Sequence, residues 1–393
     1  MTAASQGKAS HYPAILSYGF RPFFLLGTAY GALVILVWLP IFHGSLQTHS
    51  SFAAVDWHVH ETLFGYVAAV IAGFLLTAIP SWTGRLPVQG LLLFMLVLLW
   101  LAGRFAVFFS GQMHWIAALA IDGAFLAALL TAAAVEIVAG RNWRNLMVLV
   151  PVSLLLASNV LFHVEVRFSG TSDISRRLAI GIIAVLITII GGRVIPSFTR
   201  NWLARQNPGR LPAPFGRFDG LSIALAAVAF AAWSLAPDHR VTGILLVTAA
   251  GLHLVRLARW AGDRTSRDPL VLVLHAGYLF VPFGLLLAGL GALLDDHAQE
   301  VAAFHVLGVG AMGTMTLAVM TRATLGHTGH SLRADIWTCL IYVFVIMAAL
   351  TRLAAVFLPA NISLLHTAAT LWVLAFAGFC LRYGSMLMRP RLR

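Results

Sequence analysis

The chain has 393 residues, of which 60% are hydrophobic and 10% are charged, and its formal net charge is +12. This composition excludes an ordinary soluble domain and assigns most of the chain to lipid. A positive charge is also compatible with nucleic-acid binding, but the basic residues gather on one side of the predicted spans. We therefore expect a lipid bilayer, and no nucleic acid, as the partner.

Windows of about 20 apolar residues, enough to cross a bilayer as a helix, follow one another along the chain. They begin near Phe23, Val59, Val88, Trp115, Leu146, Leu178, Asp219, Val241, Leu270, Gln299, Ala334 and Ile362. A helix satisfies its own backbone hydrogen bonds in lipid, so every span is predicted to be helical. The predicted class is all-α: a polytopic membrane helical bundle of twelve transmembrane helices. It forms one integral membrane domain over residues 1–393, with a short cytoplasmic N-terminal segment, residues 1–21.

The distribution of charge predicts the orientation of the bundle. The first twenty or so residues are polar and the apolar stretch after them is long enough to span, so no cleavable signal sequence is expected. With both termini in the cytoplasm, the basic residues left in outer segments are Arg167, Arg176, Arg177 and Arg240. That asymmetry follows the positive-inside rule and supports an even number of spans.

A polar motif lies at the start of an apolar run that reaches Pro80. Its sequence is Asp56-Trp57-His58-Val59-His60-Glu61. Polar side chains at the edge of hydrocarbon are costly unless they bind something, so we expect chemistry here. His58 and His60 point about 200° apart on a regular helix. Either the helix starts at or after His58, or the two imidazoles serve neighbouring centres such as a haem and a copper. Glu61 is a partner that holds an imidazole, a metal ligand, a proton donor, or an interfacial carboxylate in water.

Counting along each span places five histidines in the outer half of the membrane: His58, His60, His163, His305 and His366. Imidazole is the commonest biological ligand for haem iron and copper, so these residues predict a redox centre. His305 is followed by Gly308, Gly310 and Gly313, which allow close approach of a helix or a flat macrocycle. A lone membrane histidine, such as His253 or His366, is more often a hydrogen-bonded contact between helices.

Charged and sulfur-containing residues inside the spans give further expectations. Cys339 and Cys380 fall inside the last two spans, so we expect neither a disulfide framework nor covalent haem attachment, and any haem would be b-type. The arginines that must be neutralised within spans are Arg104, Arg193 and Arg352. Arg104 and Asp122 lie at similar depth and favour a plain ion pair, whereas Arg352 is the candidate for binding haem propionates.

Two spans end in related sequences, which suggests an internal repeat. Pro80-Ser81-Trp82-Thr83 and Pro196-Ser197-Phe198-Thr199 each follow a glycine fifteen residues before the proline, and the tenth span is rich in glycine without the proline. One interpretation is three units of four helices, the plan of haem-copper oxidases. The other is that the prolines only end helices.

Five blocks of the sequence resemble the NnrS family of bacterial membrane proteins. They are SYGFRPFF (residues 17–24), WHVHETLFGYVAAVIAGFLLTAIPSWTGR (57–85), GGRVIPSFTRNWL (191–203), DPLVLVLHAGYLFVP (268–282) and HVLGVGAMGTMTLAVMTRATLGHTG (305–329). The resemblance implies a haem- and copper-containing inner-membrane protein of the nitric oxide response, linked to denitrification or nitrosative stress. The family's residues carry over as His58, His60, Glu61, His275, His305 and His327.

Together these observations predict haem b and copper in the outer half of the bundle, bound by His58, His60, His163 and His305. Iron is the other candidate for the second metal, and His275, His327 and His366 are secondary candidates as ligands. We expect an oxidoreductase of the nitric oxide reductase type, with Glu61 or Glu165 delivering protons. Quinol or a redox protein would supply electrons. The alternatives are a protective or sensing protein that binds nitric oxide without turnover, and a membrane transporter.

Overall fold

The structure, a computed structural model, describes residues 12–206 and 209–392. Within them, twelve helical spans are long and apolar enough to cross a membrane, which confirms an all-α, multi-pass membrane protein. Residues 1–11 of the expected N-terminal segment lie outside the described residues. All the described spans begin within about five residues of the expected positions, close to the usual error for helix ends.

Ten of these spans each contain one long helix, in some cases flanked by a short 3₁₀ turn. These helices are α1 (Phe20–Phe42), α4 (Leu91–Phe108), α5 (Trp115–Ala139), α6 (Leu149–Ser169), α7 (Asp173–Leu203), α8 (Arg217–Leu235), α9 (Arg240–Ala258), α10 (Pro269–Leu294), α13 (Ile336–Phe357) and α14 (Ile362–Met388). The second span is divided into α2 (Ala54–His60), η2 (Glu61–Val67) and α3 (Ala68–Thr83). The tenth is divided into α11 (His297–His305), η6 (Val306–Gly313) and α12 (Thr314–Thr328).

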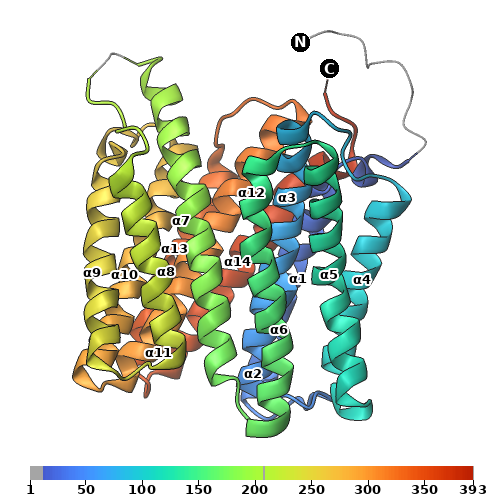
Figure 1. Cartoon of the computed structure of the whole chain (residues 1–393), viewed down its shortest axis with the longest axis vertical. Coiled ribbons are helices and arrows are strands. Elements are labelled where there is room, and N and C mark those ends of the chain that lie inside the picture. Colours follow the sequence, from blue (N-terminus) through green and yellow to red (C-terminus); the bar gives the residue numbers. More distant parts are fainter. Residues whose placement is uncertain (1–11, 207–208, 393) are drawn as a thin grey trace.

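Helix α1 begins at the same end of the bundle at which α14 ends, and α2 and α11 lie at the opposite end (Figure 1). We call these the terminal end and the far end. Arg21 ties the two helices together at the terminal end, because its Nη1 donates to the carbonyls of Leu387 at 2.9 Å and Met386 at 3.3 Å. It is 3% exposed. Arg21 therefore satisfies carbonyls at the end of α14 that have no partner within that helix.

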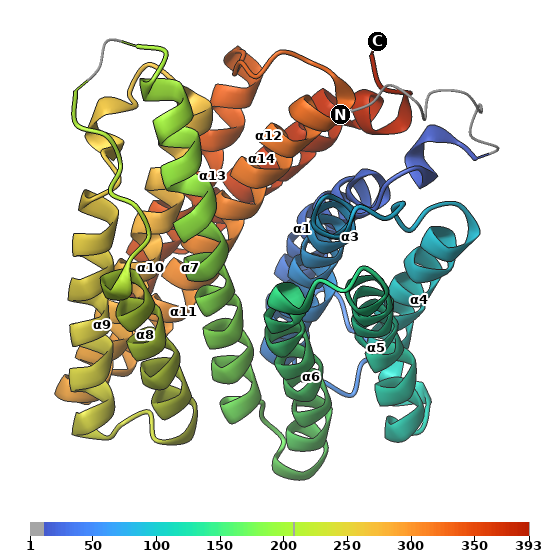
Figure 2. The ribbon, with the colours of Figure 1, turned by 45° about the horizontal axis from the view of Figure 1, so that its top comes forward.

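The second span lies at the centre of the bundle. Its most apolar window is 78% buried, against 28% for α13 at the periphery. Helix α7 packs against α6, α8 and α10. Figure 2 shows α8, α9 and α10 beyond α7, on the side away from α4 and α5. Polar residues of the second span consequently face other helices, and each of them needs a partner from the protein.

Both divided spans contain a π-helical segment that begins directly after a histidine. Segment η2 follows His60 and η6 follows His305. The wider turn of a π-helix changes which residues face a neighbouring helix, and such segments are frequent at functional sites. The sixth span is a continuous α-helix over its described length, so this feature relates the second and tenth spans and not the sixth.

The two prolines do not end their helices, so the interpretation in which they only end helices is wrong. Pro80 lies inside α3, which continues to Thr83, and Pro196 lies inside α7, which continues to Leu203. Helix α3 ends where Gly84 adopts a φ of 72°, a left-handed conformation that glycine accepts without steric cost.

Candidate functional site

A cluster of buried charges lies near the far end, between the second, third and fourth spans. Arg104 of α4 donates from Nη1 to both carboxylate oxygens of Glu61 at 2.8 Å, and its Nη2 pairs with Asp122 of α5. The ion pair expected between Arg104 and Asp122 is therefore confirmed. Glu61 is fully buried, so the interpretation of an interfacial carboxylate in water is wrong.

Two imidazoles complete this cluster. His60 Nδ1 lies 2.9 Å from Glu61 Oε1, and His60 Nε2 lies 3.1 Å from Asp122 Oδ2. His163 of α6 places its Nε2 3.1 Å from the same Asp122 oxygen. His60, Asp122 and His163 thus bring three potential metal-binding atoms within 4.8 Å of one another. We name these three residues, with Glu61 and Arg104, the buried cluster.

Apolar rings and small residues enclose the buried cluster. The rings of Phe52, Phe64 and Phe162 lie with their centroids 5.0 to 5.2 Å from that of His60. A Cβ on Gly65 would lie 2.8 Å from Arg104 Nη1, so only glycine leaves room for the guanidinium there. The enclosure excludes water, which strengthens every electrostatic interaction within it.

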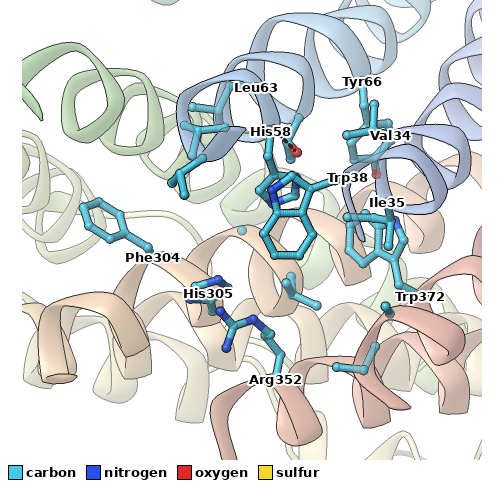
Figure 3. A pocket seen from close by; sticks show the side chains of 18 of the residues that line it. Val34, Ile35, Trp38, His58, Leu63, Tyr66, Phe304, His305, Arg352 and Trp372 are labelled. Carbon is cyan, nitrogen blue, oxygen red and sulfur yellow. Dashed lines mark hydrogen bonds between the residues drawn. The ribbon is translucent and has the colours of Figure 1, made fainter. Parts of the chain in front are cut away.

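A separate cavity of about 390 Å³ lies on the other face of the second span. His58, His305 and Arg352 line it, and they come from three different spans (Figure 3). The indole of Trp38 lies 4.6 Å from the His58 ring, centroid to centroid. We name this space the histidine cavity.

The imidazoles of the histidine cavity have nitrogen atoms free to bind a ligand. His305 Nδ1 lies 2.7 Å from the carbonyl of Val301 and donates to it, which leaves the Nε2 lone pair available. His58 Nδ1 is buried and has no hydrogen-bond partner among the described residues. A Cβ added to Gly308, in the cavity wall, would meet no described atom within 4 Å, so this part of the wall is open.

His58 and His60 therefore belong to different sites. Helix α2 begins at Ala54, so the idea that the helix starts at or after His58 is wrong. The regular helix turns His58 into the histidine cavity and His60 into the buried cluster, as the angle of about 200° between them requires. The second interpretation of this motif requires imidazoles that face two separate places in the fold, and His58 and His60 do so.

Other expected site residues lie away from both sites. Glu165 accepts the backbone N–H groups of Ile174 at 3.0 Å and Ser175 at 2.7 Å, and so caps the start of α7. His366 is exposed and stacks on His43, with ring centroids 5.0 Å apart. Neither side chain joins the buried cluster or the histidine cavity.

The histidines nearer the terminal end contact residues outside both sites. His275 Nε2 is 2.9 Å from the Thr199 hydroxyl, and His327 is exposed with its ring 5.3 Å from that of Phe20. His253 contacts the Tyr278 hydroxyl at 2.7 Å and the Ser222 carbonyl at 3.1 Å. His253 is thus the hydrogen-bonded contact between helices that was expected.

Sequence reasoning missed the wider role of Asp122 and the contribution of Asn159. Asn159 Nδ2 donates to Asp122 Oδ2 at 2.9 Å. One signal was available: Asn159 and His163 are four residues apart and share a helix face, and both are polar within an apolar span.

The comparison with known families agrees with the sequence motifs. The family model described as "NnrS protein" matches residues 14–391. The match extends beyond the five sequence blocks to include the last two spans. A search of curated proteins gave no match. Because the family model covers nearly the whole sequence, the chain belongs to the NnrS family.

Proposed function

We propose that this protein is a haem- and copper-binding oxidoreductase of the inner membrane that reduces nitric oxide to nitrous oxide. Family membership supports a role in the nitric oxide response. The observation that carries the proposal is the histidine cavity, in which His58, His305 and Arg352 converge next to a second group of imidazoles.

The histidine cavity offers donor atoms that suit haem b. Its volume of about 390 Å³ is in the range of about 300–1,000 Å³ typical of ligand sites. His58 and His305 would supply imidazole nitrogen ligands to the haem iron. Arg352 forms no ion pair with any described carboxylate, so its cation would be available to a haem propionate.

Copper would be the second cofactor, and His60 and His163 are the remaining expected ligands that the fold brings together. Bound haem and copper supply redox-active metal ions for nitric oxide chemistry. The overall reaction consumes two nitric oxide molecules, two electrons and two protons, and yields one nitrous oxide and one water. The electrons would come from quinol or a redox protein, and both termini would lie in the cytoplasm.

Glu61 is the residue best placed to handle a proton. It accepts a hydrogen bond from the Tyr30 hydroxyl and lies 2.9 Å from His60 Nδ1. Tyr30, Glu61 and His60 thus form a continuous hydrogen-bonded chain, and such chains carry protons. The capping contacts of Glu165 do not favour it for this task.

The test uses the whole chain, purified in detergent from cells supplied with haem and copper. We expect a Soret band and, with a reduced quinol as donor, removal of many equivalents of nitric oxide per haem. His305→Ala should reduce bound haem to a tenth or less, whereas His366→Ala, an exposed histidine outside both sites, should retain it.

Two outcomes would contradict the proposal. Uptake that stops at one equivalent of nitric oxide per haem would favour a protective or sensing protein. A wild-type protein without a Soret band would remove the haem assignment and favour the transporter alternative.

A further inference from the structure

We infer that the buried cluster is a mononuclear transition-metal site in which His60 Nε2, His163 Nε2 and the Asp122 carboxylate are the protein ligands. The inference deepens the proposed function by assigning the ligands of the second metal, and it rests on that function only for the choice of copper. Asp122, expected from the sequence to make a plain ion pair, becomes a ligand in this assignment.

Two of the three donor-atom spacings match those expected around a single ion. Asp122 Oδ2 lies 3.1 Å from both His60 Nε2 and His163 Nε2. Nitrogen and oxygen ligands lie about 2.0–2.2 Å from a transition metal, so two ligands of one ion stand roughly 3 Å apart. The three residues come from the second, fourth and fifth spans, and the packing of these helices fixes the spacing.

The hydrogen bonding of His60 requires a cation or a proton beside its second nitrogen. Its Nδ1–H donates to Glu61, so in the neutral ring Nε2 carries a lone pair. This Nε2 is buried and has no hydrogen-bond partner in the described part of the chain. It nevertheless lies 3.1 Å from a carboxylate oxygen of Asp122. Two acceptors at that distance repel each other unless something positive lies between them.

The charges of the cluster also favour a bound cation. Glu61 and Asp122 contribute two negative charges, and Arg104 contributes one positive charge. All three side chains are at most 5% exposed. With neutral imidazoles, the described cluster keeps one net negative charge, and an uncompensated charge in a membrane interior is costly. A bound metal cation would supply the missing positive charge, and a divalent ion with one anionic ligand in its open position would bring the net charge of the cluster to zero.

The surrounding contacts resemble those that orient metal ligands. Glu61 holds the His60 ring through Nδ1, the arrangement in which a carboxylate fixes a metal-binding imidazole. Arg104 and Asn159 both donate to Asp122 and fix its carboxylate. The phenyl rings around His60 exclude water and bulky ligands from the site.

The donor set limits the identity of the ion. Two imidazoles and one carboxylate, with no thiolate, suit copper(II), iron(II) or zinc. Three protein ligands leave a coordination position open for a small molecule. Because His58 faces the histidine cavity, the inferred metal shares no ligand with the haem. The two centres would be separate sites linked by the backbone of α2.

The experiment measures non-haem metal and haem separately on the same purified protein. Copper, iron and zinc are quantified by mass spectrometry, and haem by its pyridine haemochrome. We expect about one non-haem metal per chain in the wild type. Asp122→Asn and His163→Ala should each lower it at least tenfold while haem stays unchanged, and His305→Ala should do the reverse. His366→Ala serves as the control and should keep both.

A spectroscopic measurement on the wild type makes the test independent of whether the variants fold. Metal-stripped protein is reloaded with copper(II), and its EPR spectrum should show nitrogen hyperfine coupling from two imidazoles. A wild-type protein that binds haem but no second metal, or variants that keep their metal, would overturn the inference. The positive charge would then be a proton shared by His60 and Asp122. A purified wild-type protein that holds this metal but contains no haem would instead contradict the haem proposal.

Discussion

His58 and His60 are separated by one residue in α2, yet His58 lines the histidine cavity and His60 contacts Glu61 and Asp122 in the buried cluster. Helix α2 thus separates the histidine cavity from the buried cluster. Any ligand held by His58 and any ion held by His60 would be connected through the backbone of Val59. A change at one histidine should leave the other site assembled.

Removing the charge of Arg104 should destabilise the protein strongly. Arg104→Met leaves Glu61 and Asp122 buried without their cation, and breaking a buried pair in this way costs about 3–5 kcal/mol. Thermal unfolding in detergent measures the effect. The control is Arg85→Gln, which breaks the pair between Arg85 and Glu136, where Arg85 is 45% exposed, and should cost at most about 1 kcal/mol. Equal losses of stability in the two variants would contradict the conclusion that Arg104 neutralises two buried carboxylates.

Adding a methyl group at Gly65 should disturb the buried cluster. In Gly65→Ala the new Cβ would lie 2.8 Å from both Arg104 Nη1 and Tyr30 Cε1, and overpacking of this kind costs about 1–3 kcal/mol. The matched control is Gly251→Ala in α9, where no described atom lies within 4 Å of the added Cβ. That change should stabilise the helix by up to about 1 kcal/mol. The two variants are compared by their thermal transitions, and a stabilised Gly65→Ala protein would contradict this prediction.

Tyr30→Phe should slow nitric oxide consumption without removing either cofactor. The change deletes the hydroxyl that donates to Glu61, and loss of a positioned proton-transfer group typically costs about 10²–10⁴-fold in rate. Nitric oxide is followed with an electrode. Tyr383→Phe removes a comparable hydroxyl, 2.7 Å from Thr338, outside both sites, and should leave the rate unchanged. An unaltered rate in Tyr30→Phe would exclude Tyr30 from proton transfer.

Arg352 should contribute to haem retention through its charge. Arg352→Met is expected to raise the rate of haem transfer to a haem-free acceptor protein at least tenfold, and Arg352→Lys should restore part of the retention because it keeps the cation. The control is Arg382→Gln, which removes the contact at 2.6 Å between Arg382 and Asp335. If methionine and lysine at position 352 behaved alike, the charge would have no role in haem binding.

The expected helices agree closely with the structure because lipid imposes a simple rule on sequence. A spanning segment must be helical and apolar over its length, so hydrophobic windows identify it without knowledge of its neighbours. One of the larger deviations is in α7, which starts at Asp173 and not near Leu178. Glu165 caps that polar first turn, and a hydrophobic window cannot detect the cap.

The residues of the two sites were predicted less completely than the helices. The sequence predicted a small set of cofactor ligands and a proton donor, because polar groups in lipid need partners. They are His58, His60, Glu61, His163 and His305. It placed Glu165 among the proton donors and Asp122 in a plain ion pair. In the structure Glu165 caps a helix, and Asp122 contacts both an arginine and two imidazoles.

The sequence by itself determined the membrane class, the number of spans, the family and the opposite directions of His58 and His60. Each of these follows from hydrophobic length, from motif order or from the rotation of one helix. Only the tertiary structure decided which side chains meet. Spacing along a helix fixes which residues share a face, but packing between helices determines what that face contacts. Asp122, His60 and His163 come from three separate helices, so only the packing of those helices brings them together.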